Sequence, residues 1–211
     1  RYLPLGASDM AVVVQEIATQ RPDFVVNTLN GDSNLHFFRA LRAAGIDAKK
    51  IPVFSTSIAE VELAAIGADL VAGHYAAWNY FQSVDSDENK AFIARFRQRF
   101  GKERVLDDPM EAAYIGVKLW ADSVRNAGTA DLTPVKNILA QQSMAAPQGI
   151  VAVDFNTGHL WKTVRIGRAR ADGQFDIVWQ SDAAVHPAPF PFYRSRPEWL
   201  AEQHALAGAA R

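Results

Sequence analysis

Short apolar runs alternate with amphipathic helical patterns along residues 1–80. Strands are expected over residues 1–6, 23–29, 51–56 and 70–80, and helices over residues 9–20, 34–44 and 57–66. The apolar run within residues 23–29 is of the kind that parallel sheets bury on both faces. This alternation predicts an α/β fold, in which right-handed crossovers place helices on the faces of a parallel sheet.

Residues that commonly begin or end helices stand at the edges of these patterns. Ser8 can cap the first helix, and either Asp32 or Ser33 can cap the second. Gly45 and Gly67 follow the second and third helices, where glycine readily closes a helix. These residues favour the same helix boundaries as the apolar pattern does.

The strand–helix alternation stops after residue 80, and three helical patterns follow one another. The first covers residues 86–101, in which Phe92, Phe96 and Phe100 recur at helical spacing. A third pattern covers residues 132–142. Successive helices cannot continue the first sheet, so this block is expected to form another layer or a second lobe.

The second of these patterns, residues 107–128, predicts the longest helix. Asp108 is its expected cap and Pro109 suits its first turn. Four apolar side chains are expected to share one face of it: Ala113, Val117, Trp120 and Val124.

The apolar period changes to two after Pro147. This period predicts strands over residues 149–155 and 163–181, the second of them folded at a turn over residues 171–174. Residues 186–193 contain three prolines and are expected to be extended. A closing helix with Pro197 in its first turn is expected at the end of the chain.

Composition excludes several classes of function. Hydrophobic residues make up 49% of the chain and charged residues 21%, with a net charge of −1 and no basic stripe, so nucleic-acid binding has no electrostatic support. Apolar runs are too short to cross a membrane. Cysteine is absent, which excludes disulfides and thiol chemistry.

Catalytic signatures are also missing. The five histidines are not paired at metal-ligand spacing, and the chain contains no nucleophile elbow, Walker loop or dinucleotide-binding glycine motif. Glu60, Glu62 and Glu111 are candidate acid–base groups, but glutamates on helices are usually solvated or capping. We therefore predict no catalytic residue, no metal ligand and no cofactor.

Polar side chains cluster where two predicted strands end. Thr28, Asn30 and Asp32 follow the strand ending near Val26, and residues 55–57, which are Ser, Thr and Ser, follow the next strand. In open α/β sheets, ligands bind outside the carboxyl ends of the strands. Hydroxyl and amide groups both donate and accept hydrogen bonds, so these loops predict a site for a small neutral polar ligand.

Helix capping is the competing interpretation for part of this cluster. It is preferred for Ser33, and it is as good as ligand binding for Asp32. Thr28 and Asn30 are not explained as caps, so binding is favoured there. The aromatic residues of 75–81 are expected mainly in the core and in a crossover.

Six short motifs in order give the chain a recognisable likeness. They are PLGASD, NTLNGDSN, FSTSIAEVEL, GHYAAWNYFQSVDSDENKAF, DPMEAAYIGVKLW and APQGIVAVD. Together they resemble the type I periplasmic binding proteins, and within them the urea and short-chain amide branch. The resemblance runs from residue 1 to about residue 199.

The resemblance implies two α/β lobes joined by three crossovers, with the ligand held between the lobes. This chain resembles only the C-terminal half or so of that fold. Residues 1–77 would form most of the second lobe, residues 78–160 a helical part returning to the first lobe, residues 161–183 second-lobe strands, and residues 184–211 a tail and helix.

The resemblance also implies which residues contact the ligand. The family's second-lobe contacts fall on Thr28, Asn30 and Gly31 and on Ser55 and Ser57, with Asp32 beside them. Amino-acid-binding relatives place an acidic residue, which pairs with the ligand's ammonium, where this chain has Ser57. This departure indicates urea or a short-chain amide, and the first-lobe contacts are expected outside this chain.

The expected function is a periplasmic solute-binding protein whose partners are its ligand and an ABC transporter permease. The alternative is an amide sensor of the same fold, acting in the cytoplasm on a transcription regulator or a kinase. An enzyme is disfavoured, because no nucleophile is paired with a base.

Overall fold

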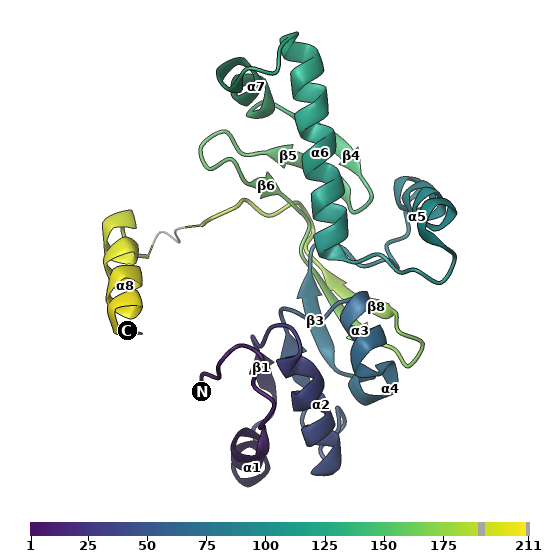
Figure 1. Cartoon of the computed structure of the whole chain (residues 1–211), viewed down its shortest axis with the longest axis vertical. Helices are drawn as coiled ribbons and strands as arrows, with labels where there is room; N and C mark the ends of the chain where they lie inside the picture. The colour runs from purple at the N-terminus through teal and green to yellow at the C-terminus, as the bar shows by residue number, and fades with distance from the viewer. Residues whose placement is uncertain (190–192, 210–211) are drawn as a thin grey trace.

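The computed structural model describes residues 1–189 and 193–209, and Figure 1 shows them as two parts joined by extended segments. The lower part contains a five-stranded sheet in the order β1 (Val25–Asn27), β2 (Val53–Ser55), β3 (Tyr75–Trp78), β7 (Arg165–Ala169) and β8 (Phe175–Gln180). The strands β1, β2 and β3 are parallel, whereas β7 and β8 run antiparallel to their neighbours. The α/β fold is therefore confirmed, with a mixed sheet.

Four helices accompany the parallel strands in the order that the sequence predicts: α1 (Ala11–Gln20), α2 (Ser33–Ala43), α3 (Glu60–Ile66) and the short α4 (Ala68–Val71). Phe38, Leu41 and Leu63 on α2 and α3 are almost fully buried, together with Val53 on β2 and Phe175 on β8. Burial of this apolar surface is the main force that holds the helices against the sheet.

Two expectations at the start of the chain are wrong. Among the described residues, positions 1–6 form no strand, because Pro4 lacks an N–H group and the left-handed Gly6 turns the chain so that the Ala7 N–H donates to the Pro4 carbonyl. Ser8 does not cap α1; the Asp9 carboxylate accepts from the N–H of Ala11 instead, at 3.0 Å.

Other boundaries agree with the sequence or shift by a few residues. Gly67 closes α3 with a φ of 103° and donates its N–H to the Leu63 carbonyl, as expected. The predicted strand over residues 70–80 is shorter, because α4 extends to Val71 and β3 begins only at Tyr75. His74 lies just before β3, where its buried ring accepts the Val53 N–H at 2.9 Å.

The upper part holds α5 (Asp87–Phe100), α6 (Asp108–Ala127), α7 (Leu132–Leu139) and a second sheet. This sheet is antiparallel, in the order β4 (Ser143–Ala146), β5 (Gly149–Val153) and β6 (Leu160–Trp161). The sequence predicted the helices and β5 but neither β4 nor β6, and α7 ends three residues before its expected end. The Ser86 side chain caps α5 by accepting the Asn89 N–H at 3.1 Å.

The cap and the apolar face of α6 differ from expectation. Asp107 rather than Asp108 is the cap, since its carboxylate accepts the Met110 N–H at 3.0 Å. The expected face lies at the surface, with Val117 66% and Trp120 53% exposed. The helix buries another row of side chains instead, against β4 and β5: Glu111, Ile115, Leu119 and Ser123.

The C-terminal segments follow the predicted order. β7 and β8 form a hairpin whose turn contains Gly173 in a left-handed conformation, as expected for residues 171–174. The last helix, α8 (Arg196–Ala209), lies apart from both parts in Figure 1. Residues 190–192 of the predicted extended tail lie outside the described residues. Among the helices described, none is both long and apolar enough to cross a lipid bilayer.

Candidate functional site

Two loops at the carboxyl ends of β1 and β2 form the candidate site. The 28–32 loop joins β1 to α2, and the 56–59 loop joins β2 to α3. Because β1 and β2 are parallel and adjacent, with Asn27 opposite Ser55, both loops leave the same edge of the sheet side by side. The sequence predicted this juxtaposition.

Side-chain hydrogen bonds hold the 28–32 loop through the backbone of Leu29. The Asn27 carboxamide oxygen accepts the Leu29 N–H at 2.9 Å, and the Asn34 amide donates to the Leu29 carbonyl at 2.9 Å. The Ser57 hydroxyl donates to the same carbonyl from the neighbouring loop. Both halves of the Leu29 backbone are therefore bound by side chains from three different elements.

The two loops are also bound to each other. The Asn27 amide donates to the Ser55 hydroxyl at 3.1 Å and to the Asn34 carboxamide oxygen at 2.9 Å. The Thr56 N–H donates to the Asn27 carbonyl at 3.2 Å. On the far side of the 56–59 loop, the indole N–H of Trp78 donates to the Ile58 carbonyl at 2.7 Å. The two loops are therefore held together as one unit at the carboxyl ends of β1 and β2.

The predicted contact residues divide into an exposed and an internal set. Thr28, Asn30, Gly31 and Asp32 are exposed, and the Asn30 amide has only a long contact of 3.5 Å with the Thr28 carbonyl. Ser55 is 1% exposed and faces Asn27, and Ser57 is partly buried against Leu29. Only the first set is exposed to solvent at the carboxyl ends of the strands.

Helix capping does not explain the polar residues at the start of α2. Asp32 occupies the cap position but its side chain makes no capping hydrogen bond. The expected cap at Ser33 is wrong, because Ser33 is the first helical residue and its buried hydroxyl has no hydrogen-bond partner among the described residues. Gly31 has a φ of 61°, a left-handed conformation that glycine adopts without strain.

Sequence reasoning missed Asn27 and Asn34, which are 3% and 1% exposed. Both stand at the ends of the motif NTLNGDSN, but nothing in the pattern distinguishes a buried amide from an exposed one. A signal was present for Asn27, since a polar residue that ends a buried strand needs an internal partner.

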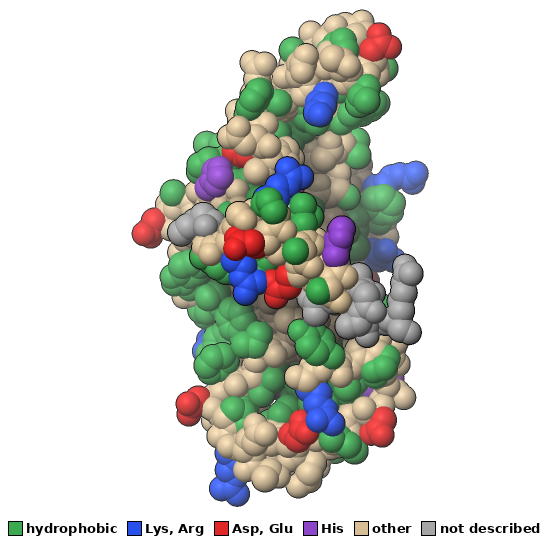
Figure 2. Space-filling model, turned by 90° about the vertical axis from the view of Figure 1, so that its left-hand side faces the viewer, with side chains coloured by type: hydrophobic (Ala, Val, Ile, Leu, Met, Phe, Trp, Pro, Cys, Tyr) green, Lys and Arg blue, Asp and Glu red, His purple; other side chains and the backbone are tan. Residues whose placement is uncertain are grey.

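A cavity of about 220 Å³ lies beside the 28–32 loop. Its lining comes mainly from α1 and β1 and combines the apolar side chains of Val13, Ile17 and Phe37 with Asn27 and Thr28. Figure 2 shows one side of the molecule, over which acidic and basic side chains are interspersed without a continuous patch of either sign.

The crossovers between the two parts are tied to the start of α6. The Asp108 carboxylate accepts the N–H groups of Asn79 at 3.1 Å and Tyr80 at 2.8 Å. The Arg165 guanidinium donates to the carbonyls of Asn79 and Gln148, the latter at 2.7 Å. Asp108 therefore fixes the crossover that leaves β3, rather than capping its own helix.

Two glutamates near the crossovers are buried, contrary to the expectation of solvated or capping side chains. Glu60 accepts the Gln82 N–H at 2.7 Å, and burial raises its pKa to about 8. Glu111 accepts from the side chain of Gln148 at 3.2 Å, and burial raises its pKa to about 7, although the Lys162 ammonium 3.8 Å away lowers it in part. The third glutamate, Glu62, does cap α3.

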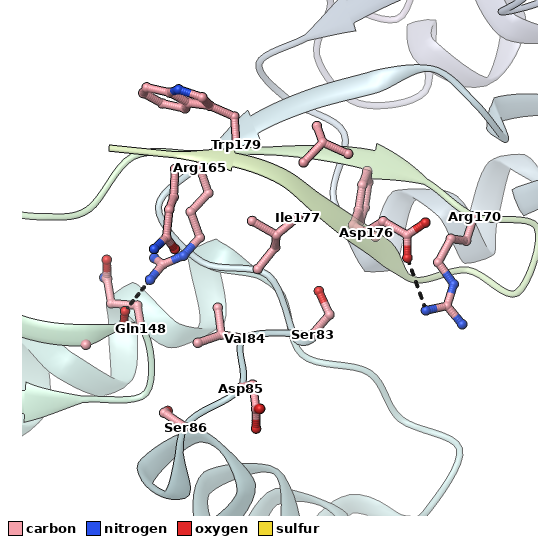
Figure 3. Close-up of a pocket in the computed structure, with 14 residues that line it drawn as sticks. Ser83, Val84, Asp85, Ser86, Gln148, Arg165, Arg170, Asp176, Ile177 and Trp179 are labelled. Carbon is pink, nitrogen blue, oxygen red and sulfur yellow. Dashed lines mark hydrogen bonds and ion pairs between the residues drawn. The ribbon is translucent and has the colours of Figure 1, made fainter. Parts of the chain in front are cut away.

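A larger cavity, of about 900 Å³, lies beside β8 (Figure 3). Its lining includes Arg165, Arg170 and Asp176. Arg165 is held by bonds to the backbone carbonyls of Asn79 and Gln148. Arg170 is paired with Asp172 and with Asp176, so its charge is already compensated. β8 and β1 are the opposite edges of the sheet, which places this cavity away from the candidate loops. Within the described residues, no cluster of histidine, aspartate or glutamate is arranged to hold a metal ion.

Comparison with known proteins gives both sequence and structural relatives. The chain is 34% identical over 124 residues to a protein named limonene hydroxylase from Geobacillus stearothermophilus, covering 59% of this chain and 23% of that protein. It is 25% identical over 175 residues to Leu/Ile/Val-binding protein homolog 6 of Brucella melitensis, covering 81% of this chain and 45% of that protein. The chain therefore spans less than half the length of these relatives.

Solved structures share the fold at lower identity. A solute-binding protein of an ABC transporter from Rhodopseudomonas palustris HaA2, in complex with p-hydroxybenzoic acid, superposes with a TM-score of 0.77 at 24% identity, over 91% of this chain and 53% of that one. A leucine-binding protein from Thermotoga maritima gives a TM-score of 0.73 at 16% identity, over 85% of this chain and 50% of that one. The family model described as periplasmic binding protein domain matches residues 1–196, and the chain therefore belongs to the periplasmic binding protein family.

Proposed function

We propose that this chain supplies one wall of the ligand site in a solute-binding protein that serves an ABC transporter. The ligand is a small neutral polar molecule, urea or a short-chain amide. Thr28, Asn30, Gly31 and Asp32 lie on the ligand side of this wall, with Ser55 and Ser57 behind or beside them. The protein would act in the periplasm and pass its ligand to a permease.

One observation carries the choice of ligand. The exposed groups of the two loops are hydroxyls, an amide, backbone groups and the Asp32 carboxylate, and neither loop contains a lysine or an arginine. Such a wall can accept hydrogen bonds from an NH₂ group and donate to a carbonyl oxygen. It offers no cation to a carboxylate ligand and no closely placed acidic side chain at residue 57 for an ammonium.

The relatives named above bear on the ligand without deciding it. Their printed names and complexes mention leucine, isoleucine, valine and p-hydroxybenzoic acid. All of these ligands carry a carboxylate, for which this wall offers hydrogen-bond donors but no lysine or arginine. Benzoates and branched-chain amino acids are therefore the proper competitors in a binding experiment.

The remaining architecture is part of the same proposal. Residues 1–77 and 161–183 belong to one lobe, residues 78–160 to the other, and residues 184–211 form the tail. The exposed apolar face of α6, with Val117 and Trp120, would be covered by the rest of its lobe.

The alternative role is an amide sensor acting on a transcription regulator or a kinase, which would use the same wall. Co-purification of the protein with a permease would support the transport role, and co-purification with a regulator would support the sensor role. We propose no enzymatic activity.

Calorimetry of the full-length natural protein tests the ligand class. Urea and acetamide are expected to bind, whereas leucine and 4-hydroxybenzoate are expected to give no heat above dilution. Tight binding of leucine or the benzoate with no binding of either amide would refute the proposed ligand.

Asn30→Ala tests the wall itself. Loss of one hydrogen bond to a bound amide is expected to weaken binding by about 1 kcal/mol, or roughly fivefold. Asn137→Ala removes an exposed amide from α7 in the other part of the molecule and serves as the matched control. Equal affinities for the two variants would show that Asn30 does not touch the ligand.

A further inference from the structure

The backbone of Leu29 is the most heavily braced point of the candidate site. Its N–H is bound by Asn27, and its carbonyl is bound by both Asn34 and Ser57. These three side chains come from the end of β1, the first turn of α2 and the loop after β2. Side-chain hydrogen bonds from three separate elements to one residue fix the position of its backbone relative to the whole lobe.

Asn27 has no amide hydrogen left to donate to a ligand, and its carboxamide oxygen is already engaged. One of its amide hydrogens goes to Asn34, the other to Ser55, and its oxygen accepts the Leu29 N–H. Because Asn27, Asn34 and Ser55 are almost fully buried, breaking any of these bonds would leave a buried polar group without a partner. The hydroxyl proton of the partly buried Ser57 is also engaged, because it is donated to the Leu29 carbonyl.

Thr28 and Asn30 flank Leu29 on either side and are exposed. When the Leu29 backbone is fixed, the Cα positions of both neighbours are fixed before any ligand arrives. A preordered contact surface spares the ligand the entropic cost of ordering the loop, which is how preorganisation raises affinity.

We infer that Asn27, Asn34 and Ser57 are positioning residues, which set ligand affinity through Leu29 without touching the ligand. This inference rests on the proposed function and assigns to Ser57 a different role from the direct contact that the sequence suggested. Ser55 belongs to the same brace through Asn27. The ligand side of the wall is then formed by Thr28, Asn30, Gly31 and Asp32.

The test compares Ser57→Ala, Ser57→Thr and the control Ser143→Ala, an exposed serine on β4. Each full-length variant is titrated with acetamide and with urea, and exchange of the Leu29 amide hydrogen is measured without ligand. Ser57→Ala leaves the Asn34 bond to the Leu29 carbonyl in place, so the fold is expected to persist.

Ser57→Ala is expected to weaken amide binding about fivefold, the equivalent of one lost hydrogen bond, and to accelerate exchange at Leu29. Ser57→Thr keeps the hydroxyl and is expected to restore both values to within twofold of the wild type, as is Ser143→Ala. A merely structural serine would lower the melting temperature without changing affinity in the folded protein.

The outcomes separate this inference from the proposed function. If the wild type binds amides and Ser57→Ala binds them equally well, the inference is overturned and the proposed function stands. Unchanged exchange at Leu29 in Ser57→Ala would also overturn it, whatever the ligand. Failure of the wild type to bind either amide would overturn both.

Discussion

Replacement of Glu60 by glutamine should make the protein more stable at pH 8 and remove most of the pH dependence of its stability above pH 7. Glu60 is 1% exposed, and its Oε2 has no hydrogen-bond partner among the described residues. Burial, with a smaller contribution from the nearby charges of Asp107 and Asp108, raises its pKa to about 8. A glutamine has the shape of the protonated acid and can still accept the Gln82 N–H.

The magnitude follows from the difference in proton binding between the folded and unfolded states. Between pH 4.5 and 8 the folded protein holds the Glu60 proton more tightly than the unfolded chain, so this group makes stability fall as the pH rises. A pKa shift of this size corresponds to at most about 4 kcal/mol at pH 8, of which about 1 kcal/mol is lost between pH 7 and pH 8.

Above pH 7, the effect of Glu60 on stability can be separated from the effects of two other buried groups, His74 and Glu111. His74 has its pKa lowered to about 4 by burial, so its opposite effect on stability is complete near pH 6.5. Glu111, with a pKa of about 7, contributes mainly below that pH. Above pH 7, the remaining slope therefore comes chiefly from Glu60.

Guanidinium chloride unfolding followed by circular dichroism at pH 7.0, 7.5 and 8.0 measures the effect, because urea is the proposed ligand and would bind the folded state. Glu103→Gln changes an exposed glutamate and is the control. A wild-type stability that is flat over this range, or a slope in Glu60→Gln equal to that of the wild type, would refute the reasoning.

Two further pairs of substitutions test packing and capping by the same unfolding assay. Asp107→Ala should lower the free energy of unfolding by about 1 kcal/mol, because α6 loses its cap. Asp108→Ala should lower it by more, because two crossover N–H groups lose their acceptor. Equal decreases for the two variants would show that Asp108 does not anchor the crossover. Gly167→Ala would place a Cβ 2.7 Å from the Phe81 ring and should cost about 1–3 kcal/mol. Gly116→Ala, in open space on α6, should instead stabilise by about 0.5–1 kcal/mol, and destabilisation there would contradict the helix-propensity argument.

Much of the fold could be predicted because its signals are local. The continuous apolar runs and the helical spacings of residues 1–142 depend on neighbours a few positions apart, and the structure has these helices and parallel strands in that order. The wrong strand over residues 1–6 came from local turn chemistry at Pro4 and Gly6, but the wrong cap of α6 came from a distant partner. Asp108 is the better cap candidate by its place before Pro109, yet its carboxylate accepts the N–H of Asn79 in the crossover, and Asp107 caps the helix instead.

For the candidate site, the sequence by itself determined which residue types stand at the strand ends and that two such ends adjoin. It did not determine which of them face outward. Asn27 and Asn30 are the same residue three positions apart, but one is buried and fully hydrogen-bonded and the other is exposed. The tertiary structure decided this, because a buried amide is stable only where partners occupy its two hydrogens and its oxygen, and here Leu29, Asn34 and Ser55 are brought together from three elements to do so.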